Sequence, residues 1–101
     1  MHNVFLGENL MADHVQEILD ILQEECAEVI QNISKCRRFG LENEYLKGSG
    51  TQRDQLAKEI GDVMAMIELL KEHGVVTQTE LDLAKRNKFV KLHQWSTIYD
   101  Q

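Results

Sequence analysis

The sequence contains no proline, only two cysteines and few aromatic side chains, which make up 6% of its 101 residues. Because proline interrupts helices, its absence, together with abundant Leu, Ile, Glu, Lys and Ala, favours long helices joined by short turns. Cys26 and Cys36 are ten positions apart in one expected helix, about 15 Å along its axis, which is too far for a disulfide. A secreted fold stabilised by disulfides is therefore not expected.

Basic side chains are missing from the first third of the chain. Residues 1–34 contain seven acidic side chains and no Lys or Arg, and the whole chain has a net charge of -6 and a pI near 5.1. A nucleic-acid polymer is not expected as a partner, because its binding depends on clustered Lys and Arg. The sequence also lacks a signal-peptide pattern and an apolar run long enough to span a bilayer, so we expect a cytoplasmic protein with no membrane partner.

Start and stop signals divide the chain into three expected helices. We expect the first helix to begin at a cap on Asp13 and to end near Phe39. The second is expected to start near Thr51, with Asp54 completing a box-like cap, and to end at Gly74, and a capping box that starts at Thr77 opens the third. Between the first two helices, a segment rich in glycine is expected to form a mobile loop.

This pattern predicts the fold class. We expect an all-α fold, an antiparallel helical bundle of three to four helices, built as a single domain over residues 1–101. Three long helices make a thin core, and both of the longer ones carry apolar side chains on more than one face. We therefore expect the core to be completed by oligomerisation, with a homo-oligomer as the functional form.

Five carboxylates occur in two short clusters, Glu24-Glu25-x-x-Glu28 and Glu59-x-x-Asp62. Helical residues three or four apart share a face, so each cluster presents a pair of acids one turn apart, and each pair continues a row of apolar side chains. Two unit charges about 5 Å apart repel by roughly 3 kcal/mol at an effective dielectric near 20. Carboxylates that converge in such a place must bind protons or a cation.

The ligand chemistry favours a hard cation. A site made only of carboxylate oxygens suits Mg²⁺ or Mn²⁺, with Mg²⁺ the first choice, whereas Zn²⁺ would recruit His or Cys. A solvated acidic helix face is the alternative interpretation, since Glu is a good helix former. Two clusters beside apolar stripes, with almost no basic side chain between the acids, weaken that alternative.

The two clusters resemble the EExxE...ExxD signature of the MazG-like, all-α nucleoside triphosphate pyrophosphohydrolase superfamily. That group also includes dimeric dUTPases, dCTP pyrophosphatases and phosphoribosyl-ATP pyrophosphohydrolase. The resemblance extends over residues 14 to 92 or so, and its further matches are Leu22-Gln23-Glu24-Glu25, Ile60-Gly61-Asp62 and Asn87-Lys88-Phe89. The thirty residues between the two clusters are more than is common in the family and indicate an enlarged connecting loop.

The resemblance implies a Mg²⁺-dependent hydrolase that converts a (deoxy)nucleoside triphosphate to the monophosphate and pyrophosphate. In the resembled family, the positions of Glu25, Glu28, Glu59 and Asp62 are metal ligands. Glu24 is then the candidate catalytic base, and an ordinary residue of the helix surface is the alternative interpretation. The resemblance also implies a homodimer or a homotetramer.

Three basic side chains and one asparagine are candidates for binding the substrate. Asn87 and Lys88 match positions that hold nucleotide phosphates in the resembled family. Lys85, on the same expected helix, and Arg38, in the last turn of the first helix, would add positive charge for a triphosphate. A solvated basic face explains Lys85 equally well, and interaction with the helix C-terminal dipole explains Arg38. Tyr45 in the loop either stacks on the base or packs on a neighbouring subunit.

A second class of function stays open. A catalytically idle, metal-binding helical module for oligomerisation or interaction with another protein would show the same carboxylates. The preferred base or sugar is not readable from the sequence, because specificity depends on pocket walls formed by the loop and by a second subunit.

Overall fold

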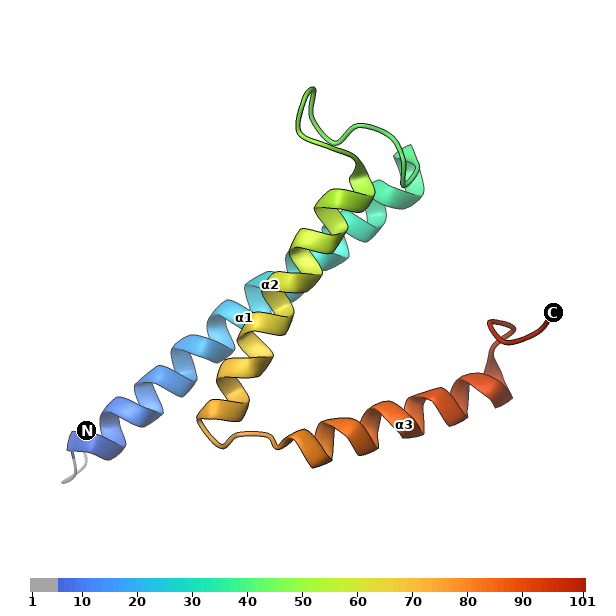
Figure 1. Cartoon of the computed structure of the whole chain (residues 1–101). Helices are drawn as coiled ribbons and strands as arrows, with labels where there is room; N and C mark the ends of the chain where they lie inside the picture. Colours follow the sequence, from blue (N-terminus) through green and yellow to red (C-terminus); the bar gives the residue numbers. More distant parts are fainter. Residues whose placement is uncertain (1–5) are drawn as a thin grey trace.

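A computed structural model describes residues 6–101 of the chain. Within that range it contains three α-helices and no strand: α1 (Leu6–Phe39), α2 (Gln52–Glu72) and α3 (Gln78–Trp95) (Figure 1). The all-α prediction is confirmed. The predicted start of the first helix at Asp13 is wrong, because α1 is already helical from Leu6. Leu10, Met11 and Ala12, which precede Asp13, favour helix, so the helix continues through this aspartate, which the sequence alone suggested as a cap.

The first two helices form an antiparallel hairpin (Figure 1). Its apolar core is thin, since Ile18, Cys36 and Leu70 are the buried hydrophobic side chains in the part of the chain that the structure describes. Three polar side chains are buried equally well, namely Asn32, Gln52 and Glu59. The half of the hairpin near the connecting loop therefore has a polar interior.

The connection between α1 and α2 is folded back on itself by backbone hydrogen bonds. Gly40, at a φ of +93°, ends α1 as the sequence predicted. The Tyr45 amide then donates to the Gly50 carbonyl and the Gln52 amide to the Asn43 carbonyl, each over 2.8 Å. These bonds place the Tyr45 side chain, which is half-buried, near the end of α1.

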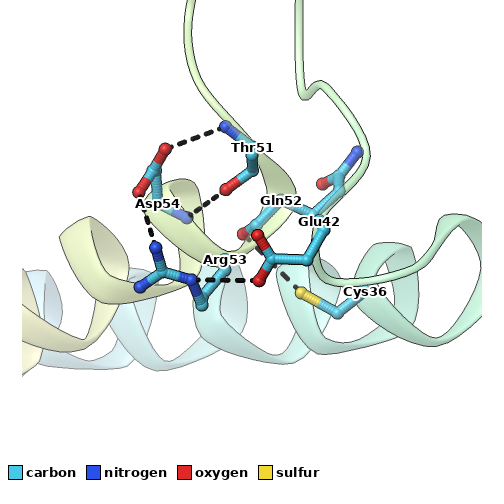
Figure 2. Close-up of polar contacts among 6 residues, drawn as sticks. All are labelled: Cys36, Glu42, Thr51, Gln52, Arg53 and Asp54. Carbon is cyan, nitrogen blue, oxygen red and sulfur yellow. Dashed lines mark hydrogen bonds and ion pairs between the residues drawn. The ribbon is translucent and has the colours of Figure 1, made fainter.

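Capping boxes open α2 and α3, as predicted. At the start of α2, Thr51 Oγ1 accepts from the Asp54 amide over 3.2 Å, and Asp54 Oδ2 accepts from the Thr51 amide over 3.0 Å. Arg53 extends this network to Glu42 in the loop, with Nε 3.2 Å from Oε1 (Figure 2). Figure 2 also shows the Cys36 thiol directed at the Gln52 carbonyl, 3.6 Å away, which ties α1 to the first turn of α2.

The third helix projects away from the hairpin (Figure 1). None of its residues is buried, and it leaves large apolar side chains such as Leu83, Phe89 and Val90 exposed. The radius of gyration is 18.0 Å, whereas a compact domain of this length has about 13 Å. Within one chain the bundle therefore consists of α1 and α2, and the predicted completion of the core by oligomerisation stays a prediction. No helix over residues 6–101 has a stretch long and apolar enough to cross a bilayer.

Candidate metal centre

The antiparallel pairing of α1 and α2 brings the two acidic clusters together. Carboxylate oxygens of Glu25, Glu59 and Asp62 all lie within 4.8 Å of one another. Glu25 lies near Asp62, and Glu28, one turn later on α1, lies near Glu59, one turn earlier on α2, and lines the same hollow. Of the four carboxylates that the sequence singled out as ligands, three thus converge across the hairpin, and the exposed Glu28 lies beside one of them, Glu59.

Two carboxylate oxygens of this group are buried without a hydrogen-bond partner. Glu59 is 4% exposed, and its Oε1 accepts a 2.7 Å hydrogen bond from Gln55 Nε2. Its other oxygen, Oε2, and Glu25 Oε2 are buried and have no hydrogen-bond partner. Leaving a buried acceptor unpaired is unfavourable, and more so for a charged one. The all-oxygen donor set and the two unpaired atoms fit a hard divalent cation.

The crowding of like charges shifts the proton affinities of the site. Burial, followed by the charges of Asp62 and Glu59, raises the pKa of Glu25 above its ordinary value. A hydrogen bond to Glu59 and the charge of that residue raise the pKa of Glu28. In the absence of a cation, a shared proton relieves part of the repulsion. Protons and a cation therefore compete for these side chains.

One basic side chain lies among the acids. Lys58 Nζ is 3.5 Å from Glu59 Oε1 and 3.2 Å from Asp62 Oδ2, and its hydrogen bond to Asp62 raises the pKa of Lys58. No basic side chain lies between the acids of the second cluster in the sequence, but Lys58, directly before that cluster, pairs with both of its acids. The signal was present, because Lys58 is four positions before Asp62 and shares its helix face.

A hollow of about 250 Å³ adjoins the carboxylates on the side of the connecting loop. Its lining residues are Glu28, Gln31, Asn32, Lys35, Tyr45, Gln55 and Glu59. Lys35 Nζ lies 5.4 Å from the centre of the Tyr45 ring, so a cation and an aromatic ring flank the hollow. Helical spacing puts Asn32 on the same row as Glu25 and Glu28, but no local pattern indicates that Lys35 and Gln55 share this space.

The other predicted site residues lie elsewhere in the single chain. Glu24 is exposed on α1 beside Glu25. Arg38 stacks on Phe39, with Cζ 5.0 Å from the ring centre, and lines a different hollow of α1 from that of Glu28. Lys85 lines a groove between α2 and α3, while Asn87 and Lys88 are exposed on α3. One chain thus does not bring these residues to the carboxylates.

Comparison with known protein families gives a match over most of the chain. The model of the MazG nucleotide pyrophosphohydrolase domain matches residues 13–85, a range that contains both acidic clusters and Lys85 but ends before Asn87 and Lys88. Searches among curated proteins and among solved structures found no match. Because the matched range covers more than half of the chain, the chain belongs to the MazG nucleotide pyrophosphohydrolase family.

Proposed function

We propose that the protein is a Mg²⁺-dependent nucleoside triphosphate pyrophosphohydrolase, which cleaves a (deoxy)nucleoside triphosphate to the monophosphate and pyrophosphate. The observation that carries this proposal is the convergence of Glu25, Glu59 and Asp62 with two unpaired, buried oxygens, in a chain of this family. In a surface cluster of acids, water would instead reach all of the carboxylate oxygens.

Glu25, Glu28, Glu59 and Asp62 would hold Mg²⁺, or Mn²⁺ in its place. Such an ion neutralises phosphate oxygens and lowers the pKa of a bound water. The chain's own contribution is to position the ligands: the hairpin holds acids from two helices face to face, and Gln55 fixes the buried Glu59 carboxylate. Because Glu59 is 4% exposed, bulk water has little access to the base of the site.

Glu24 is the proposed general base. It lies on α1 between Gln23 and Glu25, and its side chain is exposed. An exposed carboxylate that is not a ligand is free to accept the proton of an attacking water near the phosphate chain. Substitution by Gln would remove the acceptor and leave the ligands intact.

We further propose a homodimer or homotetramer in which α3 packs on another copy of the chain. The absence of buried side chains on α3 and the exposed Leu83, Phe89 and Val90 support this assembly. The substrate-binding roles proposed for Arg38, Lys85, Asn87 and Lys88 require it, because these side chains lie away from the carboxylates of their own chain. The nucleotide would then be held by residues from two subunits.

A panel of triphosphates with Mg²⁺, assayed separately for pyrophosphate and orthophosphate, tests the reaction. We expect pyrophosphate and the monophosphate from at least one nucleotide, and loss of turnover in Glu28→Gln with retained helicity. Glu17→Gln, an exposed acid on the same helix, is the control and should keep full activity. Orthophosphate alone would contradict the proposed reaction. No product across the panel would favour the idle metal-binding module.

A further inference from the structure

Lys58 is the one basic side chain paired with the carboxylates of the site in the part of the chain that the structure describes. Its ammonium group pairs with two acids of its own helix, α2, and lies 3.5 Å from Glu59 Oε1 and 3.2 Å from Asp62 Oδ2. Both acceptors belong to the residues that would hold the divalent cation. Lys58 therefore sits where it interacts with the same negative charge as the ion.

The Lys58 side chain can move away from the carboxylates without disturbing the proposed metal ligands. Its side chain is 62% exposed, and a lysine has a flexible four-carbon stem. Glu59 is held independently, since Gln55 Nε2 donates to the same Oε1 from one turn earlier on α2 over 2.7 Å. Removal of the ammonium group would thus leave the buried carboxylate in place.

We propose that Lys58 is the counter-ion of the metal-free site and that a divalent cation displaces its ammonium group on binding. This inference rests on the proposed function only in that the carboxylates bind the cation. In the metal-free protein, the positive charge of Lys58 offsets the repulsion between the acids. The same charge lowers the affinity of the site for the cation. The cluster still carries more negative than positive charge, because four carboxylates face one ammonium group, so binding of the cation remains favourable.

Two measurable effects have opposite signs. Replacement of Lys58 by Met removes the positive charge and keeps a similar stem, so the metal-free protein should lose stability while the affinity for the cation increases. Because the substitution removes a unit positive charge beside the divalent ion in a solvated setting, we expect the Kd for the ion to be about three- to tenfold smaller in Lys58→Met. A lysine that only stabilised the helix would not tighten metal binding when removed.

The experiment is a calorimetric titration of Mg²⁺ and of Mn²⁺ into the full chain without nucleotide, together with melting curves of the metal-free protein. We expect a lower melting temperature without metal, a smaller Kd for both ions in Lys58→Met, and wild-type behaviour or weaker binding in Lys58→Arg, which keeps the charge. Lys71→Met is the matched control, because Lys71 also pairs with an acid of α2, Glu68, at 2.7 Å, away from the site. It changes the net charge equally and should leave both Kd values unaltered.

The outcomes separate this inference from the proposed function. An unchanged or larger Kd in Lys58→Met, beside a wild type that binds the ions, would overturn the inference and leave the proposed function standing. Tighter binding in both Lys58→Met and Lys71→Met would also overturn it, because the effect would then reflect net charge alone. A wild type that binds neither ion would overturn the proposed function together with the inference. If Lys58→Met fails to fold, as judged by its helical circular dichroism, the same titration with Lys58→Gln decides the question.

Discussion

Gln55 donates a 2.7 Å hydrogen bond from Nε2 to Oε1 of Glu59, one turn further along α2, and the bond involves the most deeply buried carboxylate of the described acids. A neutral amide here fixes the orientation of a carboxylate without adding charge to the site. The partners of metal ligands control how well a ligand is presented, and their loss typically lowers affinity or activity by about 10- to 100-fold.

Gln55→Leu is therefore expected to weaken Mg²⁺ binding and to lower kcat/KM by about 10- to 100-fold, since Glu59 would lose its orientation. Calorimetry and steady-state kinetics measure the two effects. Gln16→Leu is the control, because Gln16 makes a similar bond to Asp20, four residues later on α1, but on an exposed surface. Equal effects of the two substitutions would show that Gln55 acts only through general helix stability.

A second prediction concerns the stability of the metal-free protein. The raised pKa of Glu25 means that folding disfavours its ionised form, with burial as the main cause and the charges of Asp62 and Glu59 next. The penalty is present at pH values above the pKa of the folded state and disappears as the pH falls below the ordinary value for Glu. Glu25→Gln should accordingly raise the melting temperature of the metal-free protein near pH 7 while reducing the rise that Mg²⁺ produces.

Thermal melts with EDTA and with Mg²⁺ test this prediction. Glu24→Gln is the matched control, because Glu24 is the adjacent, exposed residue of the same helix, and it should change neither curve appreciably. A lower melting temperature for Glu25→Gln in EDTA would mean that the carboxylate stabilises the metal-free hairpin, contrary to the repulsion argued here.

The third prediction concerns the capping box at the start of α2. The backbone hydrogen bond from Thr51, and next the hydrogen bond to the Thr51 side chain, lower the pKa of Asp54. Its contribution to stability is thus complete above the pKa of the unfolded chain and is lost as the pH falls through the lower pKa of the folded state. We expect Asp54→Asn to have a lower melting temperature than wild type at pH 6, and we expect this difference to shrink as the pH falls below about 4.

Comparing the two proteins at each pH isolates Asp54 from Glu25 and Glu28, whose raised pKa values act with the opposite sign. Thr51→Ala gives an independent measure of the cap: loss of an N-cap side chain costs about 1 kcal/mol, which corresponds to about 4–8 °C in a domain of 60–100 residues. A constant difference between wild type and Asp54→Asn from pH 6 to pH 3 would contradict ionisation as the source of the stabilisation.

The features that the sequence predicted well are local. The boxes that begin at Thr51 and Thr77 require only residues three apart, and both appear in the structure. The same holds for the acid pairs, whose spacing alone places them on one helix face. The start of α1 was missed because a single Asp13 competes with good helix formers on its N-terminal side, and a local signal does not show which prevails.

The features that escaped prediction depend on contacts between helices. Antiparallel pairing sets Glu25 against Asp62 and Glu28 against Glu59, and this register follows from packing. Helical spacing alone does not show that Lys35 lines the hollow beside Tyr45, because only the folded loop brings Tyr45 there. The position of α3 is likewise beyond local signals, because none of its side chains is buried against the hairpin.

The last prediction tests the proposed assembly with the chain's single tryptophan, Trp95, at the end of α3. Trp95 is 83% exposed in the isolated chain, so its fluorescence in a monomer should resemble that of an indole in water. If α3 packs on a second copy through Phe89 and Val90, the emission should shift to shorter wavelengths in the oligomer and return to longer wavelengths on dilution. Light scattering after size exclusion gives the mass of the same samples.

Phe89→Asp places a charge on the exposed apolar part of α3 and should convert the oligomer to a monomer with red-shifted emission, since a charge buried in an interface is strongly unfavourable. The α1–α2 hairpin does not depend on this side chain, so the helical signal of those residues should persist. Gln94→Asp adds the same charge at a polar, exposed position of α3 and should leave the mass unchanged. Two outcomes would show that α3 is not the contact between copies: a wild type with the mass of a single chain at all concentrations, or a Phe89→Asp variant that assembles as the wild type does. The proposed roles of Asn87 and Lys88 in the site of a neighbouring copy would then lose their structural basis.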